Sequence, residues 1–535
     1  TTFRRRDDPC GETASLPAAV GPSMAASGSM EDSSTGLKTQ ETVETVSSRD
    51  PVPAPITPMS EEEDDAEDKC WSAHQKSTVI FAVVIVLVVA GVIAMVVALL
   101  ATTRSRDSDN SLPTRGDGYL TCSDSERIPD LWYQCHRTYG EVVIIPPCRE
   151  DMYAALKVTL ASYFPGDLEI NSCDPRNMAL LSMADTTLSF NTSAETTPNL
   201  LERFALTTLY FSTNGNDWYY TSLWLSRTIH CAWHGINCDG VGRVIDIDLN
   251  VNNLFGSLPS ELALLTDLKT LQMTNGALTG TIPSEVYRSL SNLEELSLVG
   301  HRLTELSPEV GQLRSLKSLR LDNNDFDGST IPTEIGLLSD LEEFACSGCH
   351  LYGSLPGELG ECTKLAYVYV SNNFLIGTIP ELAPSILFLN VEHNDLDAGP
   401  FPTSLYSLTQ LTSLHLSGNA FEGSAFPTEM LTSLTSLKYF EFTGMAWTGI
   451  IPTEISKLES LENLAVSGNS LIGTIPSEMG RLTRLQYLFL DSNDLTGSLP
   501  SELGRMTDLK VLNLDKNRDL DLSSLPPEMA SLIGK

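Results

Sequence analysis

A period of about 24 residues runs through residues 244–535 and constrains the fold of this chain more than any other feature. The repeated pattern is L-x-x-L-x-L-x-x-N-x-L-x-G-x-I/L-P, and a regular copy has Leu485, Leu488, Leu490, Asn493 and Leu495 in these places. The alternation in L-x-L is typical of a short strand with every second side chain facing inward. One turn cannot bury its own leucines, so neighbouring turns must stack. The period therefore predicts a coil of stacked strands.

The register of the repeat gives twelve copies, with spacings between 21 and 26 residues. Their first apolar positions are Val244, Leu268, Leu293, Leu316, Leu341, Leu365, Ile386, Leu411, Leu437, Leu461, Leu485 and Leu509. Parallel strands stack about 4.8 Å apart, so twelve of them would form a sheet roughly 50 Å long on the inner face of the coil.

This leucine spacing is the signature of leucine-rich repeats. The stretch that follows, such as Gly473-Thr474-Ile475-Pro476, resembles the plant-type subclass found in plant receptor-like proteins and receptor kinases, with similar proteins in algae and diatoms. The resemblance implies a twisted, right-handed α/β solenoid with a second strand on its flank. It also implies a recognition surface.

The asparagine of the pattern follows each strand, where buried backbone groups need partners, and we expect its side chain to supply them. Eight copies have it: Asn252, Asn324, Asn373, Asn394, Asn419, Asn469, Asn493 and Asn517. The departures are Gly276, His301, Cys349 and Met445. Methionine cannot form such hydrogen bonds, so we expect irregularity near Met445.

Residues 200–243 are predicted to be the N-terminal cap that a solenoid needs to cover its first turn. The run from Cys231 to Cys238 is similar to the cap motif of plant-type repeats, and the resemblance implies a disulfide between these two cysteines. His230 and His234 allow a zinc site as the alternative. Zinc sites usually take closely spaced ligands from two segments, whereas these residues lie in one. We therefore favour the disulfide and expect no metal ligands and no cofactor.

A membrane helix is predicted over residues 77–103, because Val79 to Ala101 is a run of 23 uncharged residues. Such a run is long enough to cross a bilayer about 30 Å thick. Residues 1–76 are acidic, rich in Ser, Thr and Pro, and nearly free of aromatic residues, which predicts a disordered tail. We expect a single-pass protein of the plasma membrane, with this tail in the cytoplasm, where it would meet a partner, and the repeats outside the cell.

Residues 104–199 are predicted to be a linker followed by a small cysteine-containing module. Its four cysteines are Cys122, Cys135, Cys148 and Cys173, which allow three pairings. This cysteine density fits an oxidising compartment and supports the extracellular placement. Asn191 begins an N-glycosylation sequon on the same side.

Catalytic and nucleic-acid-binding functions find little support. The sequence lacks the glycine-rich loop, the H-R-D and the D-F-G of a protein kinase, so we expect no enzyme activity. Cys346-Ser347-Gly348-Cys349 resembles a redox motif, but the register places both thiols, and that of Cys362, in the core. The net charge of −35 argues against nucleic acid as a partner.

The outward positions of the concave sheet are the candidate binding residues for a protein, peptide or polysaccharide ligand. They comprise an aromatic set and an acidic rim in copies four to eleven: Tyr367, Tyr369, Phe388, Tyr439, Tyr487, Phe489, Asp322, Glu392, Glu441 and Asp491. The leading hypothesis is a receptor-like or adhesion protein without a catalytic domain. The alternatives are a structural protein of the cell wall or matrix, or a fragment of a receptor-like kinase.

Overall fold

The computed structural model describes a large part of the 535-residue chain. The described residues are 119–121, 146–163, 172–187, 189–191, 198–397, 401–421, 425–524 and 527–529. All of them belong to one compact unit, Asn110–Lys535. The predicted tail (1–76) and membrane helix (77–103) lie outside the described residues, as do Cys122 and Cys135. Across the described segments, no helix has both the length and the apolar character that crossing a bilayer requires.

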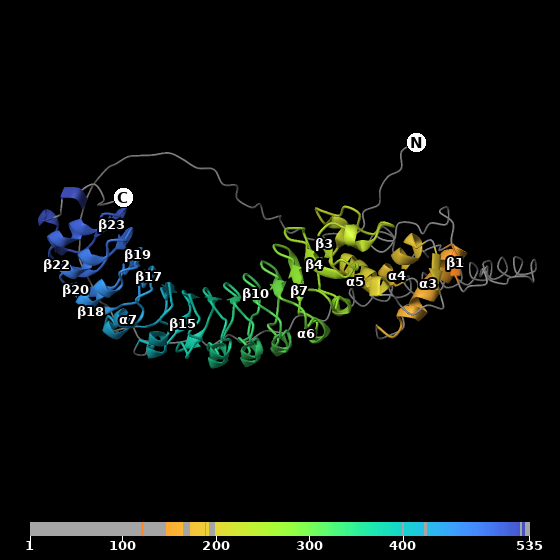
Figure 1. The fold of residues 1–535 in the computed structure, drawn as a ribbon, viewed down its shortest axis with the longest axis horizontal. Helices are drawn as coiled ribbons and strands as arrows, with labels where there is room; N and C mark the ends of the chain where they lie inside the picture. The colour runs from red at the N-terminus through yellow and green to blue at the C-terminus, as the bar shows by residue number, and fades with distance from the viewer. Residues whose placement is uncertain are drawn as a thin grey trace, which may run out of the picture. The chain divides into compact units, whose positions relative to one another are not determined.

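A long sheet of thirteen strands forms one side of the coil (Figure 1). Its first strand pairs antiparallel with the second, and the later pairs are parallel. Its strands are β3 (Ile236–Cys238), β4 (Val244–Asp248), β6 (Thr270–Gln272), β8 (Glu295–Ser297), β10 (Ser318–Arg320), β11 (Glu343–Ala345), β12 (Tyr367–Tyr369), β14 (Phe388–Asn390), β16 (Ser413–His415), β17 (Tyr439–Glu441), β19 (Asn463–Ala465), β21 (Tyr487–Phe489) and β23 (Val511–Asn513).

The register of this sheet puts like positions of successive turns side by side. The central residues of neighbouring strands, such as Leu389, Leu414 and Phe440, are cross-strand partners and are fully buried. The long strands lie along the concave side of the coil (Figure 1). In strands such as β14 and β17, the residues on either side of the central residue are at least partly exposed. Thus the leucines form the core, and the variable residues form the concave surface.

Shorter strands follow the long ones and form small parallel sheets on the flank. They are β5 (Phe255–Gly256), β7 (Ala277–Gly280) and β9 (Arg302–Leu303); β13 (Ile376–Gly377) and β15 (Asp395–Leu396); and β18 (Thr448–Ile450), β20 (Ser470–Gly473), β22 (Asp494–Ser498) and β24 (Asp519–Asp521). These are the flanking strands that the plant-type resemblance implied.

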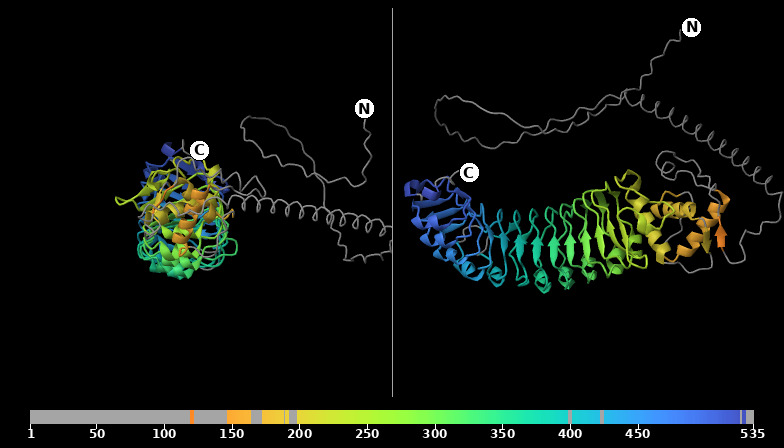
Figure 2. Two further views of the ribbon diagram at one scale, coloured as in Figure 1. Left: turned by 90° about the vertical axis from the view of Figure 1, so that its right-hand side faces the viewer. Right: turned by 45° about the horizontal axis from the view of Figure 1, so that its top comes forward.

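The convex side carries short helical arcs, mostly 3₁₀ rather than α (Figure 2). Most begin just after the proline of the pattern and span only five residues, a length typical of 3₁₀ turns. They are η3 (Ser260–Leu264), α6 (Ser284–Ser289), η4 (Pro308–Gln312), η5 (Thr333–Leu337), η6 (Gly357–Glu361), η7 (Thr403–Ser407), α7 (Thr428–Ser433), η8 (Thr453–Lys457), η9 (Ser477–Arg481) and η10 (Ser501–Arg505), with η11 (Leu522–Ser524) and η12 (Pro527–Met529) after the last long strand.

The asparagines of the pattern form a ladder of buried hydrogen bonds between turns. Asn324 Nδ2 donates to the carbonyls of Leu298 and Leu321 at 2.7 and 2.8 Å, and its Oδ1 accepts from the amide of Leu303 at 3.1 Å. Each asparagine thus bonds to its own turn and to the turn before it. The same arrangement recurs at Asn373, Asn394, Asn419, Asn469, Asn493 and Asn517.

His301 takes the place of asparagine in the third copy and makes two equivalent contacts. Its Nε2 lies 2.8 Å from the carbonyl oxygen of Met273, and its Nδ1 accepts from the amide of Leu278 at 3.3 Å. Gly276 makes room for the ring, because a Cβ at this position would lie only 2.7 Å from His301 Cε1. The second and third copies therefore depart from the pattern together.

The other two departures fill the core in different ways. Cys349 Sγ lies 3.2 Å from the carbonyl oxygen of Leu321, so its thiol can replace one asparagine contact. Met445 is buried, and its amide donates to Asn469 Oδ1 at 3.0 Å, so the expected irregularity does not extend to this ladder contact. Trp447, two residues later, lies with ring centres 4.4 Å from Phe442 and 5.1 Å from Phe426.

Helices continue the stack ahead of the first turn. They are α3 (Pro147–Leu160), α4 (Pro175–Thr186) and α5 (Pro198–Ser212); α3 packs on α4, α4 on α5, and α5 on η3. Apolar residues of all three helices join the core of the coil. A two-stranded antiparallel sheet, β1 (Tyr119–Thr121) and β2 (Ser189–Asn191), precedes α5 in the chain and contains Asn191.

The cap closes on the first turn through buried tryptophans and one ladder residue. Trp224 lies with ring centres 4.9 Å from both Trp218 and Trp233, and η1 (Gly215–Asp217) and η2 (His230–Ala232) connect this cluster to α5 and β3. Asn252 accepts from the amide of Tyr220 at 2.7 Å and donates to its carbonyl at 3.2 Å. The cap thus supplies the neighbour that the first ladder asparagine needs.

Candidate functional site

Two columns of side chains run along the concave face in copies six to eleven. The first strand positions are cross-strand partners in the order Tyr367, Phe388, Ser413, Tyr439, Asn463 and Tyr487. The third positions follow in parallel, in the order Tyr369, Asn390, His415, Glu441, Ala465 and Phe489. All six predicted aromatic residues therefore lie on this face, in two adjacent columns.

Tyr369, Phe388 and His415 form a continuous aromatic cluster. The ring centres of Tyr369 and Phe388 are 4.6 Å apart, and those of Phe388 and His415 are 5.2 Å apart. All three side chains are half-buried, so their faces are held in place while remaining accessible. Partial burial raises the pKa of Tyr369, so its hydroxyl stays neutral as a hydrogen-bond donor.

A polar network continues from His415. Its Nδ1 lies 3.2 Å from Glu441 Oε2, and Asn463 Nδ2 donates to Glu441 Oε1 at 2.8 Å. The hydrogen bond with His415 lowers the pKa of Glu441 despite partial burial, so this carboxyl is a charged acceptor at neutral pH. Glu392 lies close by, with a carboxylate oxygen within 4.8 Å of a ring nitrogen of His415 and a carboxylate oxygen of Glu441. These four residues and the aromatic cluster form one patch, which we call the central patch.

The outer aromatic residues lie apart from the central patch or at its edge. Tyr439 and Tyr487 are 40% and 37% exposed, and the strand of Asn463 separates them. Strands two places apart are about 9.6 Å apart, so these rings offer separate contacts. Lys510 Nζ lies 5.9 Å from the centre of the Tyr487 ring.

Two of the predicted acidic residues serve the coil itself. Asp322 Oδ1 accepts from the amide of Ser347 at 2.8 Å, and burial raises the pKa of Asp322. Asp491 Oδ1 accepts from Ser467 Oγ at 2.5 Å. Both carboxylates bridge neighbouring turns, and neither belongs to the central patch.

Sequence reasoning missed His415 and Asn463. Neither residue type stands out at a variable position, and their partners lie 26 and 22 residues away along the chain. The signal was nonetheless present, since aligning the copies places positions 415, 441 and 463 on three successive strands.

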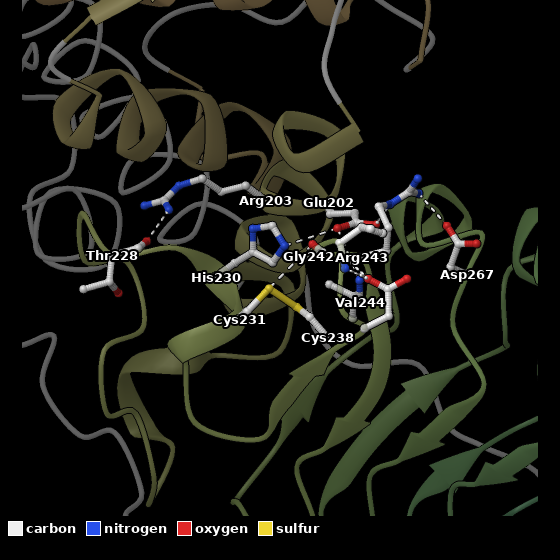
Figure 3. Close-up of polar contacts among 12 residues, drawn as sticks. Glu202, Arg203, Thr228, His230, Cys231, Cys238, Gly242, Arg243, Val244 and Asp267 are labelled. Carbon is white, nitrogen blue, oxygen red and sulfur yellow. Dashed lines mark hydrogen bonds and ion pairs between the residues drawn. A yellow bond between two sulfur atoms is a disulfide. The ribbon is translucent and has the colours of Figure 1, made fainter.

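The cap contains a second polar cluster, which Figure 3 shows. Glu202 on α5 is fully buried; its carboxylate accepts from Arg243 Nε at 2.6 Å and lies 3.2 Å from His230 Nε2. Burial alone would raise the pKa of Glu202, but the hydrogen bonds from His230 and Arg243 outweigh it, so this pKa is lowered. The amide of Val244 also donates to Glu202 at 3.3 Å, which ties α5 to the first strand of the coil.

Cys231 and Cys238 form a disulfide beside this cluster (Figure 3). Their sulfur atoms are therefore not free to bind zinc, and His230 is already paired with Glu202. Cys148 and Cys173 are disulfide-bonded as well. Cys346, Cys349 and Cys362 are free thiols with fully buried side chains, which confirms their predicted place in the core.

Comparisons with known proteins agree with the repeat architecture. A family model described as a leucine-rich repeat region matches residues 401–532. Receptor-like kinase TMK2 of Arabidopsis thaliana is 30% identical over 241 residues, which are 43% of this chain and 26% of that protein. Receptor-like protein 39 of the same plant is 33% identical over 181 residues, 33% of this chain and 18% of that protein. The chain thus spans about a quarter or less of the length of these relatives.

Solved structures of plant receptors are also similar. The plant peptide hormone receptor RGFR1 in complex with RGF2 has a TM-score of 0.47 and 26% identity, over 56% of this chain and 59% of that one. The Arabidopsis receptor kinase HAESA, in complex with the peptide hormone IDA and the co-receptor SERK1, has a TM-score of 0.47 and 28% identity, over 54% and 53% of the two chains. The repeats of this chain resemble those of plant leucine-rich-repeat receptors and receptor-like proteins.

Proposed function

We propose that this chain is a membrane-anchored recognition protein whose leucine-rich repeats bind a peptide or protein segment on their concave face. The observation that carries this proposal is the central patch, where aromatic rings and charged groups meet on one side of a rigid sheet. Sequence relatives named as receptor-like proteins and kinases support the same class of function.

The central patch has the composition of a binding hot spot. Half-buried aromatic rings lose little side-chain freedom on binding and still offer apolar area, while the surrounding polar groups fix orientation. The exposed rings of Tyr367, Tyr439 and Tyr487 extend this surface along the coil. A ligand that contacts all of them would lie across the strands from β12 to β21.

The charge of the face favours a cationic ligand. Glu392 and Glu441 are within 4.8 Å of His415, and the whole chain carries a net charge of −35. Carboxylates on the rim of an interface steer oppositely charged partners and suppress others. A basic peptide with an apolar side chain is therefore the ligand class that we propose, ahead of a polysaccharide.

The binding experiment would select peptides from a random displayed library on the purified full-length chain and measure their affinity by surface plasmon resonance. In the triple variant Tyr369→Ala, Tyr439→Ala and Phe489→Ala, we expect at least a 100-fold loss, since aromatic anchors contribute about 1–2 kcal/mol or more each.

The matched control is a double variant, Tyr352→Ala and Phe374→Ala. These two rings are 41% and 42% exposed and stack with centres 5.0 Å apart, next to the flanking strands rather than on the concave face. Affinity should be unchanged in this control. Equal binding by the triple variant, or loss only in the control, would refute the proposed face.

We propose the same membrane arrangement for this chain. It crosses the membrane once, its tail lies in the cytoplasm and meets a partner there, and its repeats lie outside the cell. The chain itself has no catalytic domain in this proposal. Protease treatment of intact cells should digest the repeats and spare the tail, and glycosidase should shift the mass unless Asn191 is replaced by Gln. The reverse protection pattern would refute this orientation.

A further inference from the structure

We propose that Glu392, His415 and Glu441 together bind one divalent transition-metal ion on the concave face. Each residue offers one ligand atom, and the three atoms lie within 4.8 Å of one another. Metal–ligand bonds to imidazole and carboxylate are about 2.0–2.2 Å long, so ligands of one ion lie up to about 4.4 Å apart. Side-chain movements of a few tenths of an ångström would complete the site. The metal ion would occupy two of the carboxylates that the proposed basic peptide would face, so its experiment measures metal binding without peptide.

Strands present two of the three ligands, and a hydrogen-bonded turn presents the third. His415 and Glu441 are the last residues of β16 and β17 and are cross-strand partners. Glu392 lies two residues beyond Asn390, which is the partner of His415 on the other side. The amide of Glu392 donates to Asn390 Oδ1 at 3.0 Å, which fixes the turn that carries this carboxylate. Ligands on neighbouring strands are held more firmly than ligands on loops.

The second layer of contacts suits metal binding through Nδ1 of His415. Nδ1 faces Glu441, while Nε2 lies 2.7 Å from Ser413 Oγ. A histidine that binds metal through one nitrogen carries its proton on the other, and a partner for that proton orients the ring. Asn463 likewise holds one oxygen of Glu441 and leaves the other directed at His415.

The number of negative charges distinguishes this cluster from an ordinary histidine–carboxylate pair. Two carboxylates lie beside His415, and Glu392 forms no ion pair with another described residue. A dication would balance both. Imidazole favours zinc and similar ions over calcium and magnesium, which prefer oxygen ligands alone. Zinc is therefore the ion to test first.

The experiment titrates zinc chloride into the tag-free, chelator-treated full-length chain by calorimetry, with calcium chloride in a parallel titration. We expect one zinc ion per chain, bound at least tenfold more tightly than calcium. Glu392→Gln, His415→Ala and Glu441→Gln should each weaken zinc binding at least tenfold. The two glutamine variants are nearly isosteric, so circular dichroism should show an unchanged fold.

The matched control is His350→Ala. His350 Nδ1 lies 3.1 Å from Asp325 Oδ1, which is the same kind of pair without a third ligand, so zinc binding should not change. A Cys346→Ser, Cys349→Ser variant should also keep its affinity. Absence of saturable zinc binding, full affinity in His415→Ala and Glu441→Gln, or loss in the cysteine variant would each overturn the proposal.

Cobalt offers a second measurement that reports on coordination directly. Visible absorption of Co²⁺ bound to the wild-type chain should show an imidazole–carboxylate site and should disappear in His415→Ala. An unchanged cobalt spectrum in that variant would place the ion elsewhere and would overturn the assignment.

Discussion

Replacing His301 by alanine should destabilise the third turn of the coil strongly. The side chain is only 5% exposed and bonds to the carbonyl of Met273 and the amide of Leu278. Removal leaves both backbone groups buried without partners, at about 1–3 kcal/mol each, so we expect a loss of roughly 2–6 kcal/mol. The void left by the ring adds to this loss.

His301→Asn is the informative companion to this variant. One turn later, Asn324 makes the equivalent contacts with Leu298 and Leu303, so an asparagine at position 301 should restore them. Its loss should stay below about 1.5 kcal/mol, because only ring packing is removed. His350→Ala, at an exposed position, serves as the control and should change stability by less than about 0.5 kcal/mol.

The assay should be local as well as global, since a repeat protein need not unfold in one step. Urea denaturation gives the overall change in the free energy of unfolding. Hydrogen exchange at the amide of Leu278 gives the local change, and its protection should fall in His301→Ala and return in His301→Asn. Equal destabilisation by alanine and asparagine would refute the view that His301 acts as a ladder residue.

Three further predictions concern pH, the cap and one glycine. Burial lowers the pKa of His301 below 6.5, so the unfolded chain binds a proton at a higher pH than the folded chain does. The free energy of unfolding should therefore fall as pH decreases from 6.5 to the lowered pKa. Urea titrations at several pH values should show this fall in the wild-type chain and not in His301→Asn. Glu202→Gln removes a buried charge from Arg243 and His230 and should cost about 3–5 kcal/mol in urea unfolding, whereas Asp267→Asn, at a partly exposed pair, should cost less than about 1 kcal/mol. Gly256→Ala should lower the melting temperature more than Gly280→Ala, because both have positive φ but only the Cβ at position 256 would meet a backbone oxygen, that of Ser212 at 2.1 Å.

The sequence predicts the periodic part of this structure well. A strand at each L-x-L, burial of the central leucines, and inward thiols at Cys346 and Cys349 follow from register alone, because every turn meets the same environment. The role of His301 could not be read in this way, since only its contacts with Met273 and Leu278 show that an imidazole can replace a carboxamide.

The candidate site could be predicted only in outline. Register placed Tyr369, Phe388 and Glu441 on the concave face, but the contact between His415 and Glu441 depends on side-chain conformations across a 26-residue turn. Asp322 shows the reverse case. It lies at a position predicted to be free for a ligand, yet its carboxylate accepts a hydrogen bond from the amide of Ser347 in the next turn. The period of the sequence therefore predicts which face of the coil a residue lies on. It does not predict which side chains contact one another on that face, because those residues differ from turn to turn.

The asparagine ladder gives the coil a preferred direction for local unfolding. The oxygen of Asn419 accepts from the amide of Leu396, which belongs to the preceding turn, and Asn394 does the same for Leu375. Losing one asparagine therefore unpairs an amide in the turn before it. Local opening should advance toward the cap more easily than away from it, and the cap, joined to Asn252 through Tyr220, is where that advance should stop.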